Sequence, residues 1–238
     1  MSLYRDQGVV LRTMRLGEAD RIVTLVTADH GKVRAVVKGV RKTKSRFGAR
    51  LEPLSHVALL CWQGRELDVV TQAEVLDHLR IVREDLNRLS RATAMLEAVD
   101  QVAQERQANP RLYEMLVGAL RALAARDAPL VVPAFFWKLL ALEGYQPLLD
   151  ACAICGAEAP LVAFDLSEGG TLCRSCRRGA AVSPHALDLV RRILGGDLAG
   201  ALEEPAGPAT HEVEVLASSA LEHHLERRLR ALRMLERT

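Results

Sequence analysis

Four of the five cysteines in this 238-residue chain fall into two pairs with the spacing of metal ligands. Cys152 and Cys155 form one Cys-x2-Cys pair, and Cys173 and Cys176 form a second pair after 17 intervening residues. A tight turn presents both thiolates of a pair to one metal ion, and two such turns complete the tetrahedron that zinc prefers. The sequence therefore predicts one structural Zn²⁺ ion held by these four cysteines.

Four thiolates would fill the coordination sphere of the ion and leave no open position for water or a substrate. We therefore expect the metal to stabilise the fold and not to catalyse a reaction. The alternatives are a redox-active pair or metal-free thiols, but a redox pair needs no second pair at this interval. The fifth cysteine, Cys61, lies in a predicted strand and is expected to be a small buried apolar side chain.

A second chemically distinctive feature is the basic segment of residues 38–50, KGVRKTKSRFGAR. It holds no acidic residue and six cations: Lys38, Arg41, Lys42, Lys44, Arg46 and Arg50. Residues 1–50 contain 12 Lys and Arg against 4 Asp and Glu, a balance of +8, whereas the rest of the chain has 20 against 26, a balance of −6. A basic segment on an otherwise acidic chain indicates a single region that binds a polyanion.

We interpret the basic segment as a DNA-binding surface, because cations that neutralise phosphates release counterions from the DNA. Arg12 and Arg34 are expected to extend this surface, and a solvated loop without a partner is the alternative. Phe47 inside the segment could stack on a base or anchor the loop in the core. Aromatic residues make up only 4% of the chain, which favours binding to the DNA backbone without sequence preference.

Five short runs rich in β-branched residues precede the four paired cysteines and predict a small closed barrel. The basic segment would connect the third strand to the fourth. The expected strands are residues 7–13, 20–27, 32–37, 54–62 and 67–75. Apolar residues then recur at helical spacing, and Pro110, Pro133 and Pro184 mark helix starts. A last predicted helix carries Leu221, Leu225, Leu229 and Leu232 on one face.

These elements predict an α+β fold in which a five-stranded OB-type β-barrel precedes an α-helical domain with an inserted four-cysteine zinc ribbon. We expect an OB-fold DNA-binding domain over residues 1–78, a helical domain over residues 79–238 and the ribbon over residues 150–180. An SH3-like barrel would also fit the number of strands.

The sequence contains no recognisable catalytic constellation. It lacks the phosphate-binding glycine loops, the GxSxG nucleophile elbow and the HExxH metalloprotease motif. His223 and His224 are adjacent on the predicted last helix, so they would lie about 100° apart and could not face one ligand, and we expect both to be surface residues. We therefore expect a protein that is not an enzyme.

No stretch approaches the roughly 18–20 apolar residues of a membrane span. The first residues, MSLYRDQGVVLRT, also lack the apolar core of a secretory signal. We therefore expect a cytoplasmic protein with reduced cysteines and no membrane partner.

The order of these features resembles the bacterial RecO family of recombination mediators over nearly the whole chain. In the barrel the resemblance rests on Gly8-Val9-Val10-Leu11, Gly17-Glu18, Thr27, Gly31-Lys32, Lys38-Gly39 with the basic loop and Ser45, and Leu51 and Pro53. Its most specific motif is Gly144-Tyr145-Gln146-Pro147-Leu148 leading into Cys152-Ala153-Ile154-Cys155-Gly156.

The resemblance implies a non-catalytic, nucleoid-associated mediator of the RecF pathway of DNA repair. Such proteins bind single- and double-stranded DNA, anneal complementary strands and help to load RecA on protein-coated single strands. The implied partners are RecR, single-stranded-DNA-binding protein, RecF and RecA. The alternative is an adaptor whose zinc ribbon scaffolds a protein complex, with only incidental DNA contact.

Overall fold

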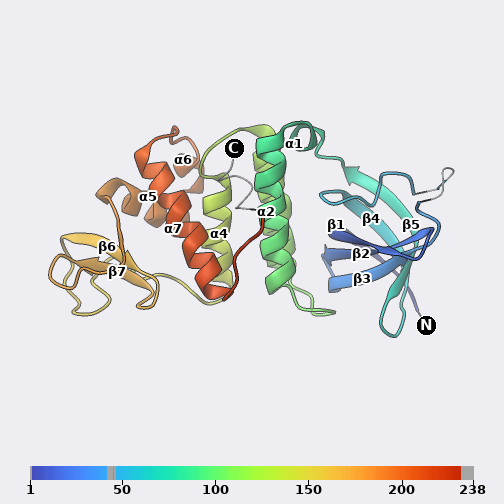
Figure 1. Cartoon of the computed structure of the whole chain (residues 1–238), viewed down its shortest axis with the longest axis horizontal. Helices are drawn as coiled ribbons and strands as arrows, with labels where there is room; N and C mark the ends of the chain where they lie inside the picture. The colour runs from blue at the N-terminus through green and yellow to red at the C-terminus, as the bar shows by residue number, and fades with distance from the viewer. Residues whose placement is uncertain (1, 42–44, 46, 232–238) are drawn as a thin grey trace. The chain divides into compact units, whose positions relative to one another are not determined.

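A computed structural model describes residues 2–41, 45 and 47–231 of the chain. The chain divides into two compact units, the first running through Ala125 and the second beginning at Arg126. The first unit contains the five strands of a barrel and three helices, whereas the second contains the two cysteine pairs and the remaining helices (Figure 1).

The barrel strands are β1 (Leu3–Leu16), β2 (Asp20–Thr27), β3 (Gly31–Val37), β4 (His56–Trp62) and β5 (Asp68–Asp77). They close in the order β1-β2-β3-β5-β4, and only the β3–β5 pair is parallel. A closed five-stranded barrel of this connectivity is OB-type, so the predicted α+β fold with an N-terminal barrel is confirmed.

Strand β1 is twice as long as the predicted strand of residues 7–13, with 14 residues. It pairs with β4 through its first half and with β2 through its second half. The register with β2 shifts between Val10 and Arg12, and a bulge of this kind bends a strand. The bend allows β1 to pair with both β2 and β4 and so to close the barrel. A hydrophobic pattern alone does not reveal this double pairing.

The barrel interior is filled by side chains from all five strands. Val10, Leu25, Val37, Val57 and Val70 belong to one buried cluster, and each is at most 1% exposed. Such burial contributes roughly 1.5–3 kcal/mol for each large aliphatic side chain. Strand β3 alternates between buried and partly buried residues, because neighbouring residues of a strand point to opposite faces.

Three helices complete the first unit: α1 (Arg80–Glu84), α2 (Leu86–Val102) and α3 (Pro110–Ala125). Asp85 separates α1 from α2 and caps α2, since its side chain accepts a hydrogen bond from the backbone N–H of Arg88. Helices α2 and α3 pack on β1, and α3 also contacts β2.

The helices of the second unit are α4 (Val131–Leu142), α5 (Pro184–Gly195), α6 (Leu198–Ala201) and α7 (Pro208–His224). Helix α4 is buried on nearly every side and packs against α5 and α7, which lie beside it in Figure 1. The predicted start of α5 is confirmed, because the Ser183 side chain accepts from the backbone N–H of Ala186 at 3.2 Å.

Helix α7 ends earlier than the leucine pattern predicts. Its last helical residue is His224, and Glu226 adopts a left-handed φ of 50°. Leu229 is fully buried beyond the end of the helix, and Leu232 lies outside the described residues. The leucine pattern therefore continues past the end of α7 because Leu229 is buried, and not because the helix is continuous.

A small sheet of three strands lies between α4 and α5 in the chain. Its strands are β6 (Leu161–Asp165), β7 (Gly170–Cys173) and β8 (Ala180–Ala181), in the order β7-β6-β8. Strands β6 and β7 pair as an antiparallel hairpin that follows the first cysteine pair and ends at Cys173.

Candidate metal centre and nucleic-acid interface

The β6–β7 hairpin brings the four predicted metal ligands together. Cys152 and Cys155 precede β6, Cys173 is the last residue of β7, and Cys176 follows in the next turn. The four sulfur atoms all lie within 4.8 Å of one another. The fold therefore joins two turns that are separated by 17 residues in the sequence into a single cluster.

Backbone hydrogen bonds form the first cysteine turn. The N–H of Gly156 donates to the carbonyl oxygen of Cys152 at 2.9 Å, and the N–H of Cys152 donates to Ala157 at 2.8 Å. Gly156 has a φ of 75°, a left-handed conformation that glycine adopts at little cost. The N–H of Ala153 donates to Thr171 on β7, so the turn is held against the hairpin.

The cluster fits a tetrahedral metal ion. The Sγ atoms of Cys155 and Cys173 are 3.7 Å apart. Four sulfurs placed about 2.3 Å from one zinc ion would be separated by about 3.8 Å. Cys152 and Cys173 are buried, whereas Cys155 is exposed, so one side of the cluster is open to solvent.

The electrostatics of the cluster also favour a cation. Backbone N–H groups of Cys173 and Cys155 lower the pKa of Cys152 to about 6. Hydrogen bonding to Cys155, followed by burial, raises the pKa of Cys176 to about 12. Four sulfurs this close cannot all ionise without a compensating charge, which a divalent ion would supply. The four thiols can therefore bind a metal ion.

Cys61 takes no part in this cluster. It lies on β4 inside the barrel, where it is 1% exposed, and burial raises the pKa of its thiol to about 12. The prediction of a small buried apolar side chain is confirmed for this residue.

The described cations of the basic segment lie at the surface of the first unit. Lys38, Arg41 and Arg50 are exposed. Arg41 donates from its backbone N–H to Ala19 at 3.0 Å and from its guanidinium to the carbonyl of Glu18 at 2.9 Å. These bonds hold the beginning of the segment against the β1–β2 turn. The predicted DNA contacts Lys42, Lys44 and Arg46 lie outside the described residues.

Phe47 belongs to the barrel core and not to the surface. It is 2% exposed and packs in the same buried cluster as Leu51 and the inward residues of the strands. Of the two interpretations of this residue, the structure favours the anchor. Phe47 fixes the end of the basic segment to the barrel and cannot stack on a base without leaving the core.

The two predicted DNA contacts on the strands have acidic neighbours. The Nε of Arg12 lies 2.6 Å from Oδ2 of Asp100 on α2, and a guanidinium nitrogen of Arg34 lies 3.9 Å from Glu105. Arg12 and Arg34 both pair with Thr24 of β2, so they lie at the same level of the sheet, beside the helical segment. Sequence reasoning missed these carboxylates, because 88 residues separate Arg12 from Asp100.

None of the helices among the described residues combines the length and the hydrophobicity that a membrane crossing needs.

The comparisons with known proteins agree with this arrangement in both parts of the chain. Residues 1–79 match the family described as recombination protein O N terminal, and residues 83–233 match the family described as recombination protein O C terminal. The DNA repair protein RecO of Frankia casuarinae is 47% identical over 243 residues, and the alignment covers 100% of both chains.

An OB-type barrel with a cationic segment, followed by helices and a cluster of four cysteines, defines a class of DNA-repair protein. The chain belongs to the recombination protein O family, RecO. A role in DNA repair and recombination follows from this membership.

Proposed function

We propose that this chain is a non-catalytic recombination mediator of the RecF pathway that binds single- and double-stranded DNA and anneals complementary strands. The barrel, residues 1–78, would be the DNA-binding domain. The observation that carries the proposal is the concentration of charge in this part of the chain, where residues 1–50 have a balance of +8. Arg41 and Phe47 attach parts of the basic segment to the barrel.

The mechanism follows from the repulsion between two polyanions. A cationic surface lowers the repulsion between two complementary strands, so base pairing can begin. The exposed Lys38, Arg41 and Arg50 contribute to this surface, together with Lys42, Lys44 and Arg46. Arg12 and Arg34 would contribute less in the free protein, because Asp100 and Glu105 offset part of their charge.

The remaining residues, 79–238, would act as a helical domain with the zinc ribbon of residues 150–180 inserted. We assign one structural Zn²⁺ to Cys152, Cys155, Cys173 and Cys176, since thiolates are preferred zinc ligands and the sulfur spacing suits a tetrahedron. This domain would present surfaces to RecR, single-stranded-DNA-binding protein, RecF and RecA during loading of RecA. The protein would act in the cytoplasm, at the nucleoid.

The test is annealing of two complementary oligonucleotides, followed by fluorescence over a salt series. The native protein is compared with the fourfold variant Arg41/Lys42/Lys44/Arg46→Ala. We expect salt-sensitive acceleration by the native protein and little by the variant, whose salt slope for single strands should fall by about 3, since each lost phosphate contact removes about 0.7.

The matched control removes the same charge elsewhere, at the exposed residues Arg111, Arg126, Arg177 and Arg228. This control should anneal DNA as the native protein does. Equal loss in both variants would mean that net charge matters and the basic segment does not. Absence of acceleration by the folded native protein would favour the adaptor alternative, in which the helical domain and ribbon scaffold a protein complex.

A further inference from the structure

The strand pairing of the barrel aligns apolar residues from all five strands in one row, which we call the outer row. Followed from β1 through β2, β3, β5 and β4 back to β1, the paired residues are Met14, Ile22, Val36, Val69, Trp62 and Leu3. Paired residues of neighbouring strands point to the same side of a sheet. Their neighbours Val37, Cys61 and Val70 fill the interior, so the outer row faces away from the core.

The outer row ends in an exposed indole. Ile22 is buried and Val36 and Val69 are half-buried, whereas Trp62 is 45% exposed and Leu3, its partner on β1, is 47% exposed. A tryptophan at the surface presents a large flat ring that can stack on another ring. Trp62 therefore stands at the surface of the barrel with apolar neighbours on β1 and β5.

Two cations without acidic partners flank Trp62. Arg5 is the next outward residue of β1 after Leu3, and Arg65 lies in the loop that follows β4. Both are exposed, and neither has an ion-pair partner within residues 2–41, 45 and 47–231. Glu66 is the acidic residue of the same loop, so the surroundings of the indole keep a positive balance.

This end of the barrel differs from the end that faces α2. Arg12 and Arg34 have Asp100 and Glu105 beside them, so part of their charge is offset within the protein. Arg5 has no such neighbour and is available to a phosphate. The charges therefore favour the surface around Trp62 as a place where the free protein can receive a polyanion.

The outer row also connects Trp62 with the basic segment. Lys38, where the basic segment begins, follows β3 directly and lies two residues after Val36. From Val36 to Trp62 the row passes from β3 over β5 to β4, which is two strand spacings or about 10 Å. A strand of DNA whose phosphates contact the basic segment can therefore reach Trp62 along the outer row without leaving the barrel.

The form of the nucleic acid is set by the indole. A single strand supplies phosphates for the arginines and exposed base rings for Trp62. The bases of a duplex are stacked on each other, so a duplex can use the cations but gains little from the indole. A protein partner would have to match the same cations with acidic residues, which makes it the less economical occupant.

We infer that Trp62 stacks on one unpaired base of a DNA strand that the basic segment holds, with Arg5 and Arg65 on the adjacent phosphates. Stacking gives the barrel a preference for single strands without a preference for sequence, because every base has a flat face. The inference rests on the proposed DNA binding by the barrel and adds the residue that contacts the bases.

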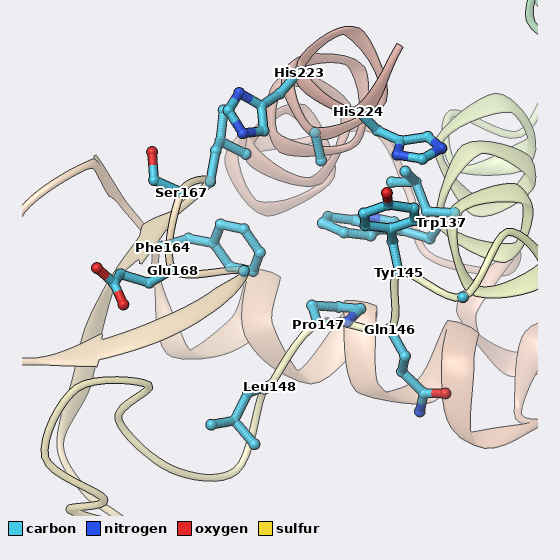
Figure 2. A pocket seen from close by; sticks show the side chains of 15 residues that line it. Trp137, Tyr145, Gln146, Pro147, Leu148, Phe164, Ser167, Glu168, His223 and His224 are labelled. Carbon is cyan, nitrogen blue, oxygen red and sulfur yellow. The ribbon is translucent and has the colours of Figure 1, made fainter. Parts of the chain in front are cut away.

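The other tryptophan of the chain is not available for this role. Trp137 is 1% exposed and lies on α4, where it lines a pocket of about 500 Å³ between α4, α7 and the β6–β7 hairpin (Figure 2). A buried indole cannot stack on an incoming base. The chain has two tryptophans, so in the Trp137→Phe variant the tryptophan fluorescence reports on Trp62 alone.

The test compares two ligands that differ only in their bases, oligothymidine and an abasic deoxyribose-phosphate oligomer of the same length. Their affinities for the full native chain are measured by fluorescence anisotropy at one fixed salt concentration. We expect oligothymidine to bind about 5- to 150-fold more tightly, the effect of one stacked base. Oligothymidine should also quench the Trp62 fluorescence of the Trp137→Phe variant in a saturable way, and the abasic oligomer should not.

Three substitutions at exposed positions test the contact. Trp62→Ala should bind oligothymidine as weakly as the abasic oligomer, while its affinities for the abasic oligomer and for a duplex stay those of the native chain. Trp62→Phe keeps an aromatic ring and should retain most of the preference. Leu76→Ala is the matched control, because Leu76 is also 45% exposed but lies at the far end of β5 from Val69. It should bind all three ligands like the native chain.

Two results would overturn the inference: equal affinity of the native chain for oligothymidine and the abasic oligomer, or an undiminished preference in Trp62→Ala. Either result would leave the proposed function standing, because phosphate binding by the basic segment does not need the indole. The proposed function fails in a different way. Native-like binding of the abasic oligomer by the fourfold variant Arg41/Lys42/Lys44/Arg46→Ala would count against DNA binding by the basic segment.

Discussion

A Cβ atom added to Gly31 would lie 1.9 Å from the carbonyl oxygen of Gln107. Gly31 begins β3, and the neighbouring Lys32 exchanges backbone hydrogen bonds with the α2–α3 connection, donating to Gln104 and accepting from Arg106. The barrel and the α2–α3 connection therefore meet backbone to backbone at a residue without a side chain. The close contact between Gly31 and Gln107 is one of those that join the barrel and the helices into the first unit.

We predict that Gly31→Ala destabilises the first unit by more than about 2 kcal/mol, because it combines a left-handed φ of 67° with a clash against backbone. Gly17→Ala is the matched control, since Gly17 has a φ of 57° and open space around it, and should cost about 1–2 kcal/mol. Urea unfolding monitored by Trp62 fluorescence in a Trp137→Phe background measures the unfolding free energy of both variants. Equal losses of stability in the two variants would show that the contact with Gln107 has no energetic effect.

Phe47→Ala should destabilise the barrel by about 3–5 kcal/mol, because it empties a buried position of the core. The same unfolding measurement checks this value. Loss of single-strand binding by a variant of unchanged stability would instead mean that Phe47 stacks on DNA and that its core contacts matter little. Phe47→Leu keeps most of the volume and should lose less stability than the alanine variant.

Removal of the metal should unfold the ribbon. We expect one zinc per chain by elemental mass spectrometry, and a large fall in melting temperature when a chelator removes it, since metal affinity contributes directly to folding. Trp137 contacts Phe164 on the hairpin, so its fluorescence in a Trp62→Phe background reports this event.

Cys173→Ser should lose most of the bound zinc, whereas Cys61→Ala should retain it, because Cys61 lies in the barrel core. Retention of stoichiometric zinc by the Cys173 variant would mean that the ion is held elsewhere.

The stability of the first unit should fall as the pH is lowered below 6.5. His56 is buried and lies 2.7 Å from the hydroxyl of Tyr113 through its Nε2. Burial, aided by the positive charge of Arg121, lowers its pKa from the ordinary value of 6.5. Below pH 6.5 the unfolded chain binds a proton that the folded chain does not. The contribution of the neutral His56 to the unfolding free energy is therefore complete above the unfolded-state pKa. It is lost as the pH falls toward the folded-state pKa.

His56→Gln removes this titration while keeping a hydrogen-bonding group near Tyr113. Its unfolding free energy should depend less on pH between about 7 and 5 than that of the native chain, with Trp62 fluorescence as the probe in both. Parallel pH profiles of the two proteins would contradict the role of His56.

Several elements could be predicted because their signals are local. Ser183 and Pro184 specify the start of α5 through a cap and a restricted φ, and two Cys-x2-Cys turns specify ligands within one short stretch. The five strands follow from short runs rich in β-branched residues. The full length of β1 did not follow, because its two halves pair with different strands across a bulge.

Contacts between residues far apart in the chain could not be predicted from the sequence. The spacing of residues gives no reason to pair Arg12 with Asp100, and a phenylalanine in a cationic run can be either a core anchor or a stacking surface. The leucines after His224 keep a helical period although α7 has ended. Burial selects apolar residues in any backbone conformation, so the pattern alone does not identify a helix.

By itself, the sequence determined the class of the fold, the candidate metal ligands and the position of the excess positive charge, because composition, turn residues and ligand spacing act over a few residues. The tertiary structure alone decided which cations have acidic neighbours, that Phe47 is buried, and that α4, α7 and the hairpin enclose a pocket. Those features depend on packing between segments far apart in the chain, where the geometry of the whole unit sets which side chains meet.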